Sequence, residues 1–131
     1  MKKKICIVVS KYNYSITKAL LNKSKKFLIS NGIKNIKVVE VSGSFEIPVA
    51  ISKLSKKYNG FIAIGCIIKG ETNNFDIISY IITDAIMKLS IHLKKPIGNA
   101  ILTCYNFKQA KKRIVKGAEP ATAVLSVLKN V

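Results

Sequence analysis

Acidic side chains are rare in this 131-residue chain, and three of the six fall where a strand pattern gives way to a helix pattern. They are Glu46, Glu71 and Asp76. A carboxylate at such a place can bind ligand hydroxyls or amines, or it can stabilise the start of a helix through the helix dipole. We expect the helix role for Asp76. For Glu46 we favour a ligand, because Phe45 places an aromatic face beside it.

Other polar residues allow two readings each. Residues 69–72 (KGET) combine a glycine turn with a helix start, where backbone N–H groups can bind an anion, although this is neither a P-loop nor a dinucleotide motif. Tyr12 either stacks on a planar ring or simply ends a strand. By themselves Arg113 and Lys116 are typical of solvated charges, and His92 is typical of a structural residue near a helix end.

The hydrophobic periodicity predicts the elements that position these residues. Apolar, β-branched runs predict strands at 4–10, 36–41, 61–68 and 97–103. A 3.6-residue period predicts a helix that starts at a cap on Asn13 or Ser15 and ends before Gly32, and further helices at 48–57, 75–93, 107–113 and 118–129. A helix after each strand indicates a four-stranded parallel sheet in a single-domain, three-layer α/β sandwich over residues 1–131, flavodoxin-like in layout. Ligands bind such sheets beyond the carboxyl ends of the strands.

Charge and cysteine content limit the partners. The net charge of +17 suits nucleic acid, an anionic membrane or acidic ligands, but it also suits a lysine-rich composition. We favour composition, and expect no specific nucleic-acid partner, because Arg113 is the only arginine and the lysines are spread along the chain. The apolar run at 5–10 is too short for a signal peptide and no run could span a membrane, so we expect a cytoplasmic protein. Cys6, Cys66 and Cys104 are expected to be buried free thiols, without a zinc site.

Five blocks of sequence, in order, resemble the 6,7-dimethyl-8-ribityllumazine synthase family. They are residues 10–17 (SKYNYSIT), 43–48 (GSFEIP), 64–76 (IGCIIKGETNNFD), 101–103 (ILT) and 109–117 (QAKKRIVKG). The resemblance implies a transferase of riboflavin biosynthesis that uses no metal or organic cofactor. It would condense 5-amino-6-(D-ribitylamino)uracil with L-3,4-dihydroxy-2-butanone 4-phosphate, releasing phosphate and water.

The resemblance also implies roles for individual residues. Tyr12 takes the place of the ring-stacking aromatic, and Glu46 accepts hydrogen bonds from the ribityl chain, which Ser44 and Phe45 also line. Cys66, Ile67 and Ile68 would contact the pyrimidine and the ribityl chain. The phosphate would be bound by the backbone N–H groups of Glu71 and Thr72 and by the Arg113 side chain. Asn99 would reach the site of a neighbouring subunit, with the basic residue Lys116 close by.

Three positions depart from the family pattern. Asn74 stands where the family usually has a proton-donating His, Asn99 stands where an aromatic is common, and the segment between Arg113 and Lys116 is shorter than in many members. The alternative function is therefore a catalytically weak or inactive homologue that serves as a scaffold. The family implies a homo-oligomer, either a pentamer or a sixty-chain shell. The charge and the short segment favour the pentamer.

Overall fold

Strands and helices alternate along the chain, as the periodicity predicts. The computed structural model describes residues 2–131. Its strands are β1 (Lys4–Ser10), β2 (Asn35–Val41), β3 (Gly60–Ile68) and β4 (Ile97–Cys104). Its helices are α1 (Tyr14–Ser30), α2 (Ile47–Leu54), α3 (Phe75–Leu93), α4 (Phe107–Arg113) and α5 (Glu119–Asn130), with the single turns η1 (Ser44–Glu46) and η2 (Ile114–Lys116).

The four strands form one parallel sheet in the order β2-β1-β3-β4. The chain reverses its direction of strand addition between β1 and β3, which is the topological switch point of a flavodoxin-like sheet. All nine residues of β3 are buried, because helices cover both faces of this central strand. The predicted fold class is confirmed.

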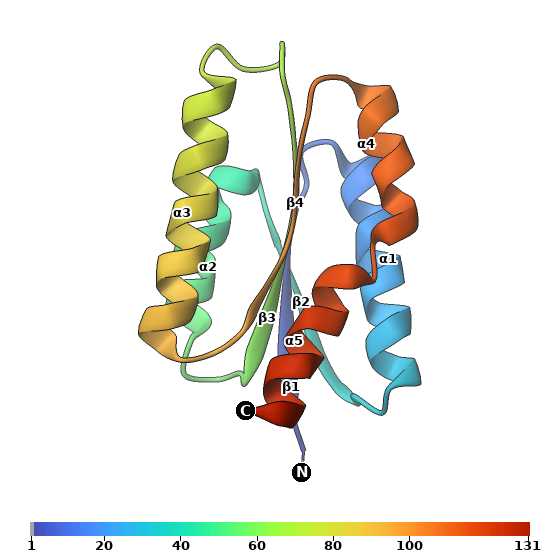
Figure 1. Ribbon diagram of the computed structural model, residues 1–131, viewed down its shortest axis with the longest axis vertical. Helices are drawn as coiled ribbons and strands as arrows, with labels where there is room; N and C mark the ends of the chain where they lie inside the picture. The colour runs from blue at the N-terminus through green and yellow to red at the C-terminus, as the bar shows by residue number, and fades with distance from the viewer. Residues whose placement is uncertain (1) are drawn as a thin grey trace.

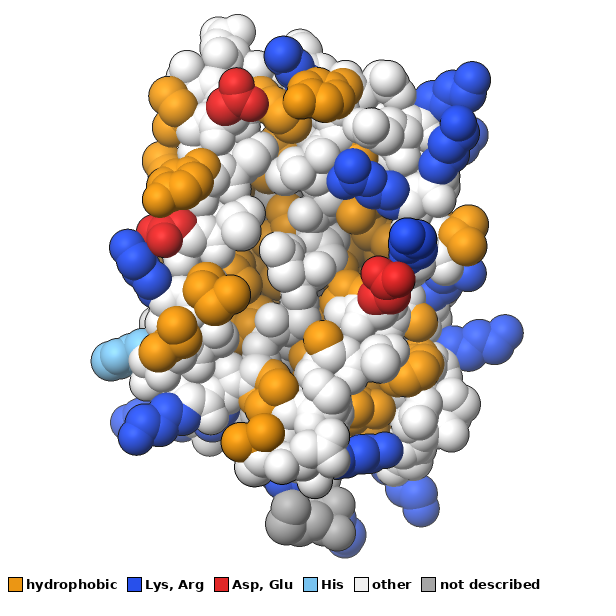
Figure 2. Space-filling model, viewed as in Figure 1, with side chains coloured by type: hydrophobic (Ala, Val, Ile, Leu, Met, Phe, Trp, Pro, Cys, Tyr) orange, Lys and Arg blue, Asp and Glu red, His pale blue; other side chains and the backbone are white. Residues whose placement is uncertain are grey.

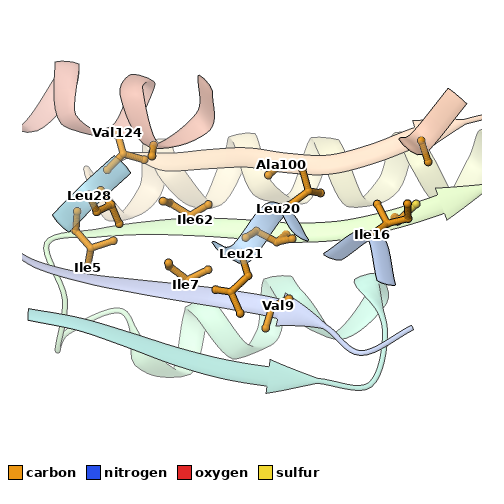
Figure 3. Close-up of a cluster of buried hydrophobic side chains, with 14 of the residues drawn as sticks. Ile5, Ile7, Val9, Ile16, Leu20, Leu21, Leu28, Ile62, Ala100 and Val124 are labelled. Carbon is orange, nitrogen blue, oxygen red and sulfur yellow. The ribbon is translucent and has the colours of Figure 1, made fainter. Parts of the chain in front are cut away.

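Helices cover the sheet in two layers (Figure 1). On one face, α2 and α3 bury a cluster that includes Ile51, Phe61 and Ile86. On the other face, α1, α4 and α5 enclose the cluster shown in Figure 3, to which Ile62 and Leu20 belong. Neighbouring residues of β3 point to opposite faces, so Phe61 and Ile62 enter different clusters. The sheet is thereby packed between two apolar layers, while its edge strand β2 stays partly exposed.

Two details of the helix ends differ from expectation. The second helix ends at Leu54 instead of near Lys57, because the chain tightens into a turn in which the Ser55 N–H donates to the Ser52 carbonyl at 3.4 Å. The first helix begins after Asn13, but no side-chain hydrogen bond caps it. Asn13 therefore occupies the expected capping position, but the prediction that its side chain caps the helix is wrong. The side chain bonds other residues instead.

Charged side chains are spread over the surface without forming one basic block on the face seen in Figure 2. Within residues 2–131 the one ion pair joins Lys88 Nζ to Asp84 Oδ2 at 2.9 Å along α3. No helix in this described part of the chain is both long enough and apolar enough to cross a membrane. His92 and Asp76 lie in the last and first turns of α3, the positions expected for a basic and an acidic residue.

Candidate functional site

A hollow of about 180 Å³ opens at the switch point, at the carboxyl ends of β1 and β3. We call it the switch-point hollow. Most of the residues with implied ligand roles line it, together with Gly43, Ile78 and Ile82. Those residues are Tyr12, Ser44, Phe45, Cys66, Ile67, Ile68, Glu71 and Thr72. Three segments far apart in the sequence therefore meet around one small space, because parallel strands end at the same edge of the sheet.

The β2 end of the hollow is formed by η1. The Phe45 ring is 60% exposed and offers an apolar face to anything that enters. Beside it, the Ser42 hydroxyl donates to Glu46 Oε1 at 2.9 Å. Glu46 is the N-cap residue of α2, but its side chain makes no capping hydrogen bond, so its carboxylate can stabilise this helix start only through the dipole. Glu46 is not among the residues that line the hollow, but its carboxylate lies beside Gly43, which does, and it keeps further acceptor capacity.

Ser44 lies unusually close to β3, and Gly65 makes this possible. A Cβ atom at position 65 would stand 2.2 Å from Ser44 Oγ and 3.1 Å from Ser44 Cβ. Ser44 is itself buried. The absence of a side chain at Gly65 thus decides how closely η1 packs against the central strand.

We expect Gly65→Ala to lower the free energy of unfolding by about 1–3 kcal/mol, because the added methyl overpacks a closed interface. Urea unfolding monitored by circular dichroism measures the change. The double variant Gly65→Ala/Ser44→Ala removes the shorter contact and should recover part of the loss. An unchanged unfolding midpoint in Gly65→Ala would contradict this account of the packing.

The end of β3 supplies the floor of the hollow through Cys66, Ile67 and Ile68, all of them buried. Burial raises the pKa of the Cys66 thiol to about 12, with smaller contributions from Cys104 and Glu71. The thiol therefore stays protonated near neutral pH and is a poor nucleophile. Cys66 contributes shape and a backbone carbonyl instead of covalent chemistry.

The loop between β3 and α3 forms the wall opposite η1. Gly70 adopts a left-handed conformation with φ of 97°, which turns the chain toward the helix. The Glu71 N–H already donates to the Ile68 carbonyl at 3.1 Å, so this geometry does not leave it free for an anion, contrary to the implied role. Among residues 2–131 the Thr72 N–H has no hydrogen-bond acceptor. Thr72 is therefore the better anion donor of the two.

Asn74 lies at the capping position of α3 and borders a different hollow. This space of about 480 Å³ is lined by the loop and the first residues of α3, and Thr72 lines both spaces. The Asn74 side chain makes no capping hydrogen bond, while its carbonyl accepts from the Ile78 N–H at 2.9 Å. Its amide is thus free to reorient.

Asn13 is a site residue that the sequence patterns did not reveal. Its side-chain amide donates to the Cys66 carbonyl at 3.1 Å and to Glu71 Oε1 at 3.0 Å. In the sequence, Asn13 carried the signal of a helix cap, and nothing local shows that the amide crosses to residues more than 50 positions away.

The remaining implied residues lie on a second surface. Asn99, Arg113 and Lys116 line a hollow of about 640 Å³ between β4, α4 and α5, which we call the β4 hollow. Arg113 Nη1 donates to the Thr103 carbonyl at 3.3 Å, and Asn99 Oδ1 accepts from the Ile101 N–H at 2.9 Å. The two hollows share no lining residue. One chain alone does not bring these three residues to the switch-point hollow.

Comparison with known proteins gives one consistent result. The family model described as 6,7-dimethyl-8-ribityllumazine synthase matches residues 2–131. A protein of that name from Polaromonas sp. strain JS666 is 38% identical over 131 residues, which cover 97% of this chain and 85% of the relative. Proteins of the same name from Paracidovorax citrulli and Buchnera aphidicola are 35% and 37% identical, with 97% of this chain covered in both cases and 85% and 86% of the relatives.

Proposed function

The chain belongs to the 6,7-dimethyl-8-ribityllumazine synthase family, and from this premise we propose that it catalyses the family's condensation. The reaction joins 5-amino-6-(D-ribitylamino)uracil to L-3,4-dihydroxy-2-butanone 4-phosphate and gives the lumazine, phosphate and water. The observation that carries the proposal is the meeting of residues 44–45, 66–68 and 71–72 with Tyr12 at one hollow of the sheet. Glu46 belongs to the same turn, η1, and accepts from the Ser42 hydroxyl. A scaffold without activity would not need these side chains together.

The hollow fits the two substrates by their chemistry. The Tyr12 and Phe45 rings suit a planar pyrimidine and its neighbouring chain, since both are more than half exposed beside the hollow. Glu46 and Ser44 can bond ribityl hydroxyls, and the ends of Cys66, Ile67 and Ile68 can contact the ring edge. These assignments are part of the proposal.

The chemistry requires little from side chains. The uracil amine attacks the ketone, and loss of a first water gives an imine. Phosphate then leaves, and ring closure releases a second water. Positioning two reactants can contribute about 7–11 kcal/mol, whereas one acid–base group contributes roughly 10²–10⁴-fold. Turnover should therefore survive with Asn74 in place of His, at a reduced rate.

We propose that the complete site needs two chains. The switch-point hollow, at about 180 Å³, is smaller than the roughly 300–1,000 Å³ common for ligand sites. The β4 hollow of a neighbouring copy carries the groups that are missing, namely Arg113 and Lys116 for phosphate and Asn99 for the ring. An arginine fork binds phosphate through two parallel hydrogen bonds.

The proposed assembly is a pentamer of this single domain, in the cytoplasm, with small-molecule substrates. Exposed apolar side chains on α3 support an interface between copies, namely Ile77, Tyr80, Ile81, Met87 and Ile91. Apolar side chains also gather over α3 in Figure 2. Such a patch on one helix is typical of a protein–protein contact.

We expect light scattering in physiological salt to give a particle near five chains. Five chains of +17 carry +85 in total, and the charge that repels itself is larger still in a closed shell of sixty chains. Physiological salt screens the repulsion between charges only when they are more than about 8 Å apart. Native mass spectrometry provides an independent mass. A stable sixty-chain particle free of nucleic acid would contradict the prediction.

The assay of the function itself uses purified full-length protein with both substrates. Formation of the lumazine, followed by its absorbance and by phosphate release, should exceed the uncatalysed rate at equal concentrations. A rate equal to the uncatalysed one, with the substrates still bound, would support the scaffold alternative and reject the proposal.

A further inference from the structure

Asn13 occupies the capping position of α1 but does not cap the helix. Its backbone is left-handed, with φ of 57° and ψ of 45°, and its carbonyl accepts the Ile16 and Thr17 N–H groups. An asparagine at this position usually accepts a helix N–H with its side chain, and losing that bond destabilises the helix. The chain gives up this bond and holds a non-glycine residue in a sparsely populated conformation. Such a departure points to another use for the side chain.

That use is visible in the hydrogen bonds of the amide. The Asn13 NH₂ group has two donors, and both find acceptors on residues that line the hollow, the Cys66 carbonyl at 3.1 Å and Glu71 Oε1 at 3.0 Å. The amide thus ties the loop after β1 to the end of β3 and to the loop before α3. Asn13 also follows Tyr12 directly, and the Tyr12 N–H is fixed to the Ser42 carbonyl at 3.1 Å.

The hydrogen bond from Asn13 to the Glu71 carboxylate matters because of where this carboxylate lies. It lines the same hollow as Thr72, whose N–H is free to bind an anion. A carboxylate that turns toward a phosphate repels it, and because Glu71 is exposed, the repulsion acts mainly at short range. The Asn13 amide holds the carboxylate against the loop after β1 and offers it a donor that compensates part of its charge.

We propose that Asn13 is a positioning residue for the phosphate-bearing substrate. It acts through Glu71, which it keeps turned away from the anion, and it aligns the Tyr12 loop with the loop before α3. The inference rests on the proposed function, because it assumes that residues 71–72 face a phosphate group.

The first test replaces Asn13 by Gly, which keeps the left-handed backbone and removes only the amide. We expect the KM for the phosphate substrate to rise about tenfold, with a much smaller change in kcat, since one hydrogen bond to a charged group is lost. The Kd of inorganic phosphate, measured by calorimetry, should rise in parallel. Asn31→Gly, at the other end of α1, is the matched control and should change neither value.

A second pair of variants separates positioning from support of the helix. Asn13→Asp keeps a good capping residue that tolerates the left-handed conformation, but it sets two carboxylates against each other. We expect it to raise KM and the phosphate Kd more than Asn13→Gly does. Adding Glu71→Gln supplies an amide donor to the introduced carboxylate, so the double variant Asn13→Asp/Glu71→Gln should return both values toward wild type. Glu71→Gln alone completes the cycle.

The outcomes distinguish this inference from the proposed function. Unchanged KM and Kd in Asn13→Gly, or no recovery in the double variant, would overturn the role of Asn13. If kcat, KM and the unfolding midpoint all shift together, Asn13 is only a structural residue and the inference fails. If the wild type makes no lumazine, the proposed function fails, while the phosphate Kd values of the same variants still decide on Asn13.

Discussion

Arg113→Ala is expected to lower kcat/KM by about 100-fold, because a bidentate bond to phosphate contributes about 3 kcal/mol. Arg113→Lys keeps the charge but loses the planar fork, so it should raise the KM for the phosphate substrate only several-fold. Steady-state kinetics with the phosphate substrate varied measure both effects. Lys108→Ala is a suitable control, because it removes a positive charge from the same helix and lines neither hollow.

Mixing two damaged chains tests where Arg113 acts. In the proposed two-chain site, Glu46→Ala should damage the switch-point half and Arg113→Ala the β4 half. If each site is built from two neighbouring chains, random assembly of equal amounts restores about one quarter of the sites to the intact pairing. Activity should then rise to about one quarter of wild type after the subunits are dissociated and reassembled. If both halves come from one chain, the mixture keeps only the average of the two low activities.

Asn74→His is expected to raise kcat at least about tenfold, since a positioned acid–base group contributes roughly 10²–10⁴-fold. An amide cannot donate a proton near neutral pH, whereas an imidazole with a pKa near 6.5 can. The replacement is structurally mild, because the Asn74 side chain makes no capping hydrogen bond.

The pH dependence of kcat identifies the role. A proton donor must be protonated, so the gain from Asn74→His should be present below about pH 6.5 and be lost as the pH rises above it. Asn73→His places the same ring one residue away and should give no such gain. A flat kcat in Asn74→His, without a new titration step, would show that proton transfer does not limit the reaction.

Local patterns were sufficient to predict the elements and their order. The helices Phe75–Leu93 and Phe107–Arg113 have the expected bounds. The first of them ends where Lys94 turns left-handed just before Pro96. The sequence predicts an end of α2 near Lys57, whereas the helix ends at Leu54. Ser55 still has helical backbone dihedrals, but its N–H bonds the Ser52 carbonyl, three residues back, so the α-helical hydrogen bonding has already stopped. Signals that act within a few residues are readable in the sequence.

The site was predictable only in part, and the reason is distance along the chain. Strand ends in a parallel sheet must share one edge, so the meeting of Tyr12, Ser44 and Glu71 followed from the topology. The direction of the Asn13 amide and the placement of Arg113 on a separate hollow depend on packing between remote segments. No periodicity or motif within one segment encodes such choices.

The central position of β3 has a consequence for how the site forms during folding. This strand pairs with β1 and β4, which are distant in sequence, so both pairings require the closure of long loops during folding. The switch-point hollow does not exist until β1, η1 and β3 have joined, and a ribosome-bound chain that has not yet released β3 has no place for substrate. Amide protons of β3 should be among the slowest to exchange with solvent, because they open only when the whole sheet does. The switch-point hollow therefore depends on the joining of segments that are remote in sequence, and not on any one segment folding by itself.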